Sequence, residues 1–391
     1  NCGYHSHKVS KQTQSDRIII INTYRAIVSL IVFIFCSSIH VSAKDLDQAS
    51  TTQRIANSTQ YDKENKIFKN TVPTPEVVGR QTSPKIIYDF FFSKNDRRPT
   101  QKLPEVTTAP SMLASKSNEL RFIWLGHSTI FLEVEGIRIL LDPIFSKYAS
   151  PVPFSIKRFQ PPAITLDKIS DIDVVLISHN HYDHLDKKTI KKLAKGNIQF
   201  IVPLGVGKLL KSWGVKTDRI TELDWWESTE LNGLTLTATP AQHFSGRWLI
   251  DNNKTLWASW SISGKTQRVF FSGDSGYGPH YKEIGDKLGP FDLTFLENGA
   301  YDDGWPYIHQ TPEQTVQAHQ DLRGDLLVPI HWGMFDLGLH SWYEPIERLS
   351  KAAKEQQENL LTPILGEIIN IKDKLPSKQW WKPLINPINP E

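Results

Sequence analysis

The sequence feature that most restricts the fold is a run of seven residues, Ser178-His179-Asn180-His181-Tyr182-Asp183-His184. It begins at the last residue of the apolar run 173–178, which is typical of a buried strand. Alternation places His179 and His181 on one side of an extended chain, and a following turn can bring Asp183 and His184 to a second position. Imidazole and carboxylate are the ligands that zinc prefers where thiolates are absent. The run therefore predicts a metal site at a strand end; its alternative, a surface histidine cluster on a turn, fits the spacing poorly.

Three further residues of ligand type stand where other strand-like runs end. His243 follows the run 234–239, Asp274 follows 268–272, and His331 follows 326–330. Taken singly, each position suits a structural residue as well as a ligand. Together with the first cluster they supply five histidines and two aspartates, the number that two ions need when they share one carboxylate and one water.

The apolar pattern predicts an α/β fold for the compact region 86–374. Two strand-like runs, 129–134 and 137–141, meet at Gly136 as in a hairpin. The other predicted strands are 120–125, 173–178, 198–202, 219–223, 234–239, 256–262, 268–272 and 326–330, and the predicted helices are 187–195, 313–322 and 342–356. Strands dominate the first part and strand–helix alternation ends the chain, which suits two sheets with helices outside them, an α/β sandwich.

The first 43 residues have the pattern of a targeting segment. No Asp, Glu, Lys or Arg occurs between Arg25 and Lys44, the run 26–35 is apolar, and small residues end the interval at 41–43. This pattern is typical of a secretory signal peptide, and an uncleaved anchor is the alternative because 18–21 adds apolar length. We therefore expect export, to a periplasm, or anchoring in an inner membrane.

Composition separates the remaining segments and excludes some classes of protein. Residues 44–80 are polar without apolar periodicity and are predicted to be a linker, and the Pro-rich residues 375–391 a C-terminal extension. A formal net charge of +3 gives no electrostatic footprint for a nucleic-acid partner. Cys2 and Cys36 both precede residue 40, so neither a disulfide framework nor a cysteine nucleophile is available after them.

Longer motifs surround the ligand positions. They include Trp124-Leu-Gly-His-Ser-Thr129, Leu141-Asp-Pro-Ile-Phe145, Leu223-Asp-Trp-Trp-Glu227, Pro240-Ala-Gln-His243, Phe271-Ser-Gly-Asp-Ser-Gly-Tyr277, Gly299-Ala-Tyr301 and His331-Trp-Gly333. With the His-x-His-x-Asp-His cluster they resemble the metallo-β-lactamase superfamily and, within it, the N-acylphosphatidylethanolamine-hydrolysing phospholipase D family and its bacterial relatives. The resemblance implies an αββα sandwich, with residues 81–374 as the hydrolase domain and a dinuclear zinc site on one edge.

The resemblance also implies a role for each ligand. One zinc ion would be held by His179, His181 and His243, the other by Asp183, His184 and His331, and Asp274 would bridge the two. Iron or manganese can occupy similar sites.

Two more residues, Asp142 and His309, take their roles from the same resemblance, and His127 is interpreted from its position. Asp142 would orient a ligand histidine. His309 would bind or protonate the substrate near the scissile phosphate; alternatively it only flanks the helix that begins at Glu313. His127 fits a buried structural histidine better than a ligand.

The implied reaction is the hydrolysis of a phosphodiester. Two zinc ions about 3.5–4 Å apart lower the pKa of a bridging water toward ~7 and so deliver hydroxide at neutral pH. Attack on N-acylphosphatidylethanolamine would give N-acylethanolamine and phosphatidate, with Asp274, Asp183 and His309 nearest the chemistry. The alternative on the same site is hydrolysis of a lactone, a thioester or a small soluble phosphodiester. The near-balanced charge argues against a metallo-nuclease, and the complete ligand set argues against a non-catalytic zinc-binding protein.

Two surface features bear on membrane contact. Lysines at 187, 188, 191, 192 and 195 form a basic helical face, which is either solvated or in contact with anionic lipid. Trp380 and Trp381 are candidates for a membrane interface, whereas Trp225 and Trp226 are expected in the core. The expected partners are thus a phospholipid or other phosphodiester, a membrane surface and, from the resemblance, a second copy of the chain.

Overall fold

The computed structural model describes residues 50–75, 96–107, 113, 115–152, 155–248, 250–373, 375–376 and 378–385. All of them belong to one compact unit, Val41–Glu391. The expected signal peptide or anchor, 1–43, lies outside the described residues. Within the described part, no helix is both long and apolar enough to cross a bilayer.

The first sheet has seven strands in the order β16-β3-β4-β5-β6-β7-β8. Their bounds are β3 Arg121–Trp124, β4 Ile130–Val134, β5 Ile137–Leu141, β6 Val174–Leu176, β7 Gln199–Pro203, β8 Ile220–Leu223 and β16 Ile368–Asn370. β16, β3, β4 and β5 run antiparallel, and β4 and β5 form the predicted hairpin, with Gly136 at φ +82°. From β5 to β8 the strands are parallel and mostly buried, which explains their continuous apolar runs.

The second sheet also has seven strands, in the order β15-β14-β13-β12-β11-β10-β9. Their bounds are β9 Ser228–Leu231, β10 Leu234–Thr239, β11 Ser259–Ser263, β12 Arg268–Phe271, β13 Phe291–Glu297, β14 Gly324–Ile330 and β15 Asn359–Leu360. β9 to β12 are antiparallel, whereas β12 to β15 are parallel. The carboxyl ends of β12, β13 and β14 therefore lie at one edge.

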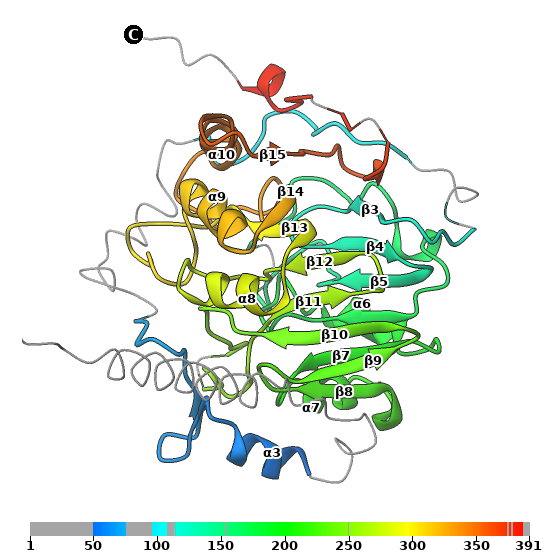
Figure 1. Ribbon diagram of the computed structural model, residues 1–391, viewed down its shortest axis with the longest axis vertical. Coiled ribbons are helices and arrows are strands. Elements are labelled where there is room, and N and C mark those ends of the chain that lie inside the picture. Colours follow the sequence, from blue (N-terminus) through cyan, green and yellow to red (C-terminus); the bar gives the residue numbers. More distant parts are fainter. Residues whose placement is uncertain are drawn as a thin grey trace, which may run out of the picture. The chain divides into compact units, whose positions relative to one another are not determined.

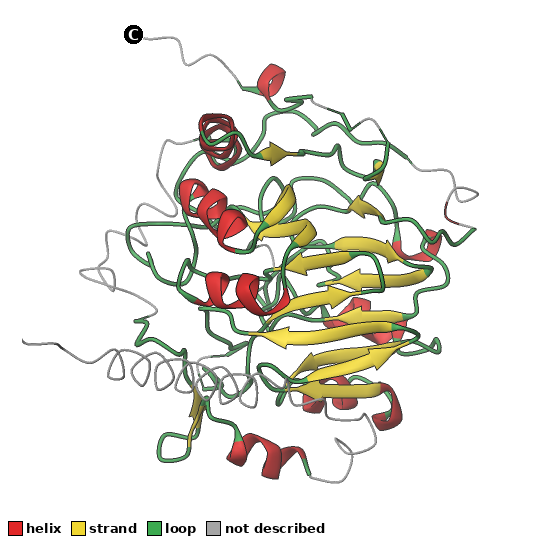
Figure 2. Cartoon of the chain, viewed as in Figure 1, coloured by secondary structure: helices red, strands yellow, loops and turns green. Residues whose placement is uncertain are grey.

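Helices cover the outer faces of both sheets (Figures 1 and 2). They are α6 Lys187–Leu193, α7 Gly207–Ser212, α8 His280–Leu288, α9 Pro312–Asp321 and α10 Glu344–Glu355, with short 3₁₀ turns at Leu166–Lys168, Thr217–Arg219 and Lys382–Leu384. In β6, Val175 belongs to the same apolar cluster as Ile190 of α6, while Val174 and Leu176 belong to the other cluster, between the sheets. On the second sheet α9 packs against β13 and β14. The result is the expected αββα sandwich.

Six elements of the sheets and their covering helices were not predicted from the apolar pattern: α7, α8, β9, β13, β15 and β16. Gly285 interrupts the helical pattern of α8, but a Cβ there would lie 2.0 Å from the carbonyl oxygen of Asp321, so the glycine allows α8 to approach the end of α9. β13 carries Asp292 and Glu297 among its apolar residues and follows Gly289-Pro290, features that read as a loop.

Residues 51–75, part of the expected polar linker, contain regular structure. Helix α3 (Thr51–Asn57) is capped by Ser50, and β1 (Tyr61–Asp62) pairs with β2 (Ile67–Phe68). Phe68 is fully buried, and Arg54 forms an ion pair with Glu227. A few anchoring side chains attach this segment to the domain, and they leave no periodic signal in the sequence.

The aromatic pair near the C-terminus is buried, so the prediction that it faces a membrane is wrong. Trp380 stacks on Trp332 with ring centroids 5.3 Å apart, and Trp381 donates its indole N–H to Glu347. Trp225 is buried as expected. Sequence alone does not separate a core tryptophan from an interfacial one, because both present an apolar ring and a polar N–H.

Candidate metal centre

The seven predicted ligands meet at one edge of the sandwich, although they come from both sheets. Two groups of ligand atoms each lie within 4.8 Å of one another. The first group is His179, His181, His243 and Asp274, and the second is His127, Asp183, His184 and His331. The structure thus brings together the two sets expected from the sequence and adds His127 to the second.

One oxygen of Asp274 lies between the two groups. Its Oδ2 is 3.0 Å from His331 Nε2 and 3.1 Å from His184 Nε2 in the second group. The same oxygen is 3.7 Å from His243 Nε2 and 3.9 Å from His179 Nε2 in the first. A carboxylate that binds two metal ions at once must lie between their two sets of ligands, and Asp274 does.

Within each group the donor atoms converge. His181 Nδ1 lies 2.8 Å from His179 Nε2 and 3.3 Å from His243 Nε2. In the other group, Asp183 Oδ2 lies 3.3 Å from His331 Nε2 and 3.4 Å from His184 Nε2. Two small sets of nitrogen and oxygen donors therefore each face a common point.

These donors fit divalent cations. Asp274 Oδ1 is buried and makes no hydrogen bond among the residues described. Over the same residues, the ion-pair partners of Asp183 and Asp274 are all histidines, with no lysine or arginine. Buried carboxylates need compensating positive charge. Imidazole and carboxylate donors suit zinc, and iron or manganese can use the same set.

The protein groups alone already favour positive charge at this point. Burial opposes a charge on His331, but the carboxylates of Asp274 and Asp183 outweigh it and raise the pKa of His331 to about 10. Burial likewise opposes a charge on His184, and Asp274 and Asp183 still raise its pKa well above the usual value. Burial lowers the pKa of His181 and of His243 to about 3, so these rings are neutral donors.

Contacts on the outer side of the rings fix their orientation. Asp142, fully buried after β5, accepts from Ser178 N at 2.7 Å through Oδ1 and lies 2.7 Å from His184 Nδ1 through Oδ2. His243 Nδ1 is 2.9 Å from the carbonyl oxygen of Ile308. Such partners hold a ligand ring in one orientation and one tautomer.

The strand ends that carry the site adopt an uncommon backbone conformation. Asp142, His127 and His331 have φ values of +37°, +55° and +63°. Left-handed conformations of residues other than glycine cost energy and cluster at functional sites. Gly273 also has a positive φ, and a Cβ there would lie 2.4 Å from Ser178 Cβ, so a glycine is needed before Asp274.

His127 is buried, as its sequence position predicts, but it also touches a ligand. Its Nε2 lies 2.9 Å from Asp183 Oδ2, and its carbonyl oxygen accepts from His331 N at 3.2 Å. It therefore supports Asp183 and ties the ends of two strands from different sheets. His127 stands three residues after the end of β3, and this position could have indicated from the sequence that it lies at the edge of the metal ligands.

His309 lies at the metal centre, and it contacts Glu297, a residue that the sequence analysis did not identify. Its ring lies with Asp274 and His331 in a third group of ligand-type residues within 4.8 Å. Its Nδ1 bonds to Oε1 of Glu297, a fully buried carboxylate at the end of β13. Because β13 was not predicted, nothing marked Glu297 as a residue at a strand end.

A cavity of ≈ 310 Å³ opens onto the metal-ligand cluster. His181, Asp183, His243, Asp274, His309 and His331 line its polar end. Its remaining lining is apolar: Phe244, Ala300, Trp305, Ile308 and Leu337. The space thus has the shape of an apolar pocket that ends at the ligands.

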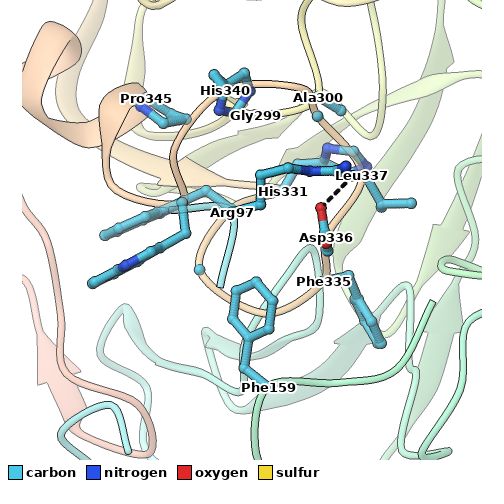
Figure 3. Close-up of a pocket in the computed structure, with 14 residues that line it drawn as sticks. Arg97, Phe159, Gly299, Ala300, His331, Phe335, Asp336, Leu337, His340 and Pro345 are labelled. Carbon is cyan, nitrogen blue, oxygen red and sulfur yellow. Dashed lines mark ion pairs between the residues drawn. The ribbon is translucent and has the colours of Figure 1, made fainter. Parts of the chain in front are cut away.

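A second, much smaller cavity lies beside His331 (Figure 3). Its ≈ 20 Å³ suffices for about one water. Arg97 and Asp336 line it and form an ion pair of 2.6 Å. This pair ties the loop after His331 to the segment before β3, and the space is too small for a substrate.

Comparisons with known proteins agree with this geometry. Residues 137–332 match the "Beta-lactamase superfamily domain". The chain is 41% identical over 302 residues to an uncharacterised protein of Mycobacterium tuberculosis, covering 76% of this chain and 80% of that protein. It is 37% identical over 269 residues to the N-acyl-phosphatidylethanolamine-hydrolyzing phospholipase D 1 of Caenorhabditis elegans, covering 64% and 76%. A solved metallo hydrolase from Ignicoccus hospitalis shares the fold, with a TM-score of 0.50 and 22% identity over 65% of this chain and 99% of its own.

Proposed function

Because this chain belongs to the beta-lactamase superfamily and, within it, to the N-acylphosphatidylethanolamine-hydrolysing phospholipase D family, we propose that it cleaves a phospholipid phosphodiester at a dinuclear zinc centre. The chain is a metal-dependent hydrolase with a metallo-β-lactamase fold. The proposed substrate is N-acylphosphatidylethanolamine, and the proposed products are N-acylethanolamine and phosphatidate.

The observation that carries the proposal is the cavity on the ligand cluster. Its polar end can take a phosphoryl group, while Phe244, Trp305 and Leu337 offer an apolar wall to an acyl or glyceryl chain. A small polar substrate would leave this wall in contact with water. The lining therefore favours a lipid over a lactone, a thioester or a small soluble phosphodiester.

Two zinc ions, held by His179, His181 and His243 and by Asp183, His184 and His331 with Asp274 shared, would supply activated water and neutralise charge on the phosphoryl oxygens. The chain's own residues prepare this chemistry. Asp142 holds the His184 ring with Nε2 toward Asp274, and His127 holds Asp183. His309 lines the polar end of the cavity, within reach of a bound phosphoryl oxygen or of the leaving oxygen.

The test is hydrolysis of N-acylphosphatidylethanolamine vesicles by protein of known metal content. A soluble ester, bis(p-nitrophenyl) phosphate, is measured beside it, and Asp274→Asn is the matched variant. We expect lipid turnover that the variant abolishes. Turnover of the soluble ester alone would remove the lipid from the proposal and favour the small-substrate alternative.

A cavity variant tests the lipid wall separately. Leu337→Gln adds a polar group to the lining and should lower turnover of the lipid while leaving the soluble ester unaffected. Leu209→Gln, a half-buried leucine on α7, is the control for a general loss of stability. Equal effects of Leu337→Gln on both substrates would argue that the acyl chain does not use this cavity.

Location and assembly belong to the same proposal. We propose that the enzyme is exported or membrane-anchored, and that the exposed lysines of α6 meet anionic lipid. Reversing Lys187, Lys188 and Lys191 to glutamate should then reduce co-sedimentation with anionic vesicles but not with neutral ones. The proposed homodimer is tested by analytical ultracentrifugation.

A further inference from the structure

Glu297 is a buried carboxylate to which the mechanism above gives no role. It is the last residue of β13 and is fully buried. It pairs in register with Ile330 of β14, the residue before His331. Glu297 therefore lies at the same edge as the ligands, between the strand that leads to Asp274 and the strand that leads to His331.

Two hydrogen bonds hold the carboxylate. Oε2 accepts from the backbone N–H of Ser275 at 2.6 Å, and Oε1 shares a hydrogen bond with Nδ1 of His309. Over the described residues no lysine or arginine pairs with it, and its ion-pair partner is His309. A buried carboxylate is costly unless both oxygens are bonded, so each of these contacts is needed.

The backbone of Glu297 anchors the segment that carries His309. Its carbonyl oxygen accepts from Gln310 Nε2 at 2.9 Å and from Thr315 Oγ1 at 2.8 Å. Its N–H donates to Ser272 Oγ at 3.0 Å. The residues that follow His309 are thus attached to the end of β13.

These contacts decide which atom of His309 can meet a substrate. Because Glu297 engages Nδ1, Nε2 is the ring nitrogen left for the cavity that His309 lines. The ring centroid lies 5.1 Å from that of His243 and 5.4 Å from that of His331. A flip of the ring about its Cβ–Cγ bond would turn Cδ2 toward Glu297 and put Cε1 in the place of Nε2, and so withdraw Nε2 from the cavity.

We propose that Glu297 is a positioning residue that acts through His309: it fixes the orientation and tautomer of the imidazole so that Nε2 faces the phosphoryl group. The claim that Nε2 faces a phosphoryl group rests on the proposed function, whereas the claim that Glu297 fixes the orientation of the His309 ring is independent of it. Carboxylate–imidazole pairs of this kind orient the histidine in many hydrolytic sites.

A competing role would act through the other oxygen. The bond to Ser275 N–H holds the residue after Asp274, so Glu297 could instead shape the metal-binding loop. The two roles differ in outcome. Loss of a loop support lowers metal content and adds to any effect at His309, whereas a role through His309 does neither.

A double-mutant cycle separates them. Glu297→Gln, His309→Ala and the double variant are loaded with zinc, and kcat and KM are measured on bis(p-nitrophenyl) phosphate. We expect Glu297→Gln to lower kcat by about 10- to 100-fold with KM and zinc content unchanged. In the His309→Ala background the same change should have no further effect. Losses that multiply, or a fall in bound zinc, would overturn the proposal.

Glu222→Gln is the matched control. Glu222 is also a buried carboxylate that accepts backbone N–H groups, from Gly205 at 2.8 Å and Gly207 at 3.0 Å, but it lies on β8 in the other sheet. Its replacement should leave kcat unchanged. An equal loss of kcat in this control would assign the effect of Glu297→Gln to stability and overturn the proposal.

A second readout does not depend on activity. Long-range ¹H–¹⁵N NMR of the full chain labelled at histidine reports which ring nitrogen carries the proton, and His309 is assigned by its absence in His309→Ala. We expect an Nδ1–H tautomer in the wild type that is lost or mixed in Glu297→Gln. An unchanged tautomer in the variant would overturn the positioning role. A wild type that cleaves no phosphodiester but passes this test would refute the proposed function alone.

Discussion

Asp142→Asn should weaken metal binding without a change of shape at the site. The wild-type carboxylate accepts from Ser178 N–H at 2.7 Å through Oδ1, and its Oδ2 lies 2.7 Å from His184 Nδ1 and accepts from Ser178 Oγ at 2.5 Å. An asparagine has one acceptor oxygen, which the backbone N–H of Ser178 keeps. The amide NH₂ then faces the Nδ1–H of His184, a donor against a donor.

The size of the effect follows from the tautomer. To accept from the amide, His184 must move its proton to Nε2, the atom that lies 3.1 Å from Asp274 Oδ2 and that must be unprotonated to bind a cation. Loss of such an outer partner costs about 10- to 100-fold in metal affinity. This equals about 1.4–2.8 kcal/mol, close to the ~1.5–3 kcal/mol of a hydrogen bond to a charged group.

The assay is equilibrium competition for zinc against a chelator of known affinity. Asp292→Asn is the control, because Asp292 accepts a backbone N–H from Arg268 at 2.7 Å at the opposite end of β13. We expect weaker zinc binding in Asp142→Asn and none of this effect in the control. Unchanged zinc affinity in a folded Asp142→Asn protein would refute the argument that Asp142 sets the tautomer of His184.

Three further predictions concern stability. Zinc at 100 to 1,000 times its Kd should stabilise the fold by about 2.7–4.1 kcal/mol, so chelation should lower Tm in calorimetry; an unchanged Tm would contradict a site built around metal. Trp381→Ala should cost about 3–5 kcal/mol in urea unfolding, because Trp381 is 1% exposed; a loss under about 1 kcal/mol would show that the C-terminal aromatic pair is not part of the core. Burial lowers the pKa of His280 to about 3 from 6.5. Below pH 6.5 the unfolded chain therefore takes up a proton that the folded chain does not, and stability falls as pH drops from 6.5 toward 3. His280→Gln should make that fall shallower between pH 4 and 6.5 and leave it unchanged above.

The metal centre could be located from sequence because its residues obey a simple rule of position. His179, His243, Asp274 and His331 each come just after an apolar strand, and the carboxyl ends of these strands lie at one edge of the sandwich. Ligand chemistry and strand ends are both local signals. The α/β sandwich follows from the same pattern, since continuous apolar runs predict strands buried on both faces, whereas the αββα arrangement was implied by the family resemblance.

What escaped prediction depends on contacts between distant segments. Glu297 belongs to the site because it forms hydrogen bonds with His309 and Ser275, and the spacing of these residues in the sequence does not predict either bond. Phe68 and Trp381 are buried by partners elsewhere in the chain, although each lies in a segment that looks polar or Pro-rich. Local pattern describes an element's own face and period, but not which distant surface will cover it.

The most direct test of the account is hydrolysis of N-acylphosphatidylethanolamine vesicles in H₂¹⁸O, with the products identified by mass spectrometry. Zinc-loaded protein should form phosphatidate that carries one ¹⁸O and N-acylethanolamine that carries none, because the water attacks phosphorus. Turnover should stop on chelation and return with zinc. Release of free fatty acid, ¹⁸O in the ethanolamide, or turnover that survives chelation would contradict a metal-dependent phosphodiesterase of phospholipase D type.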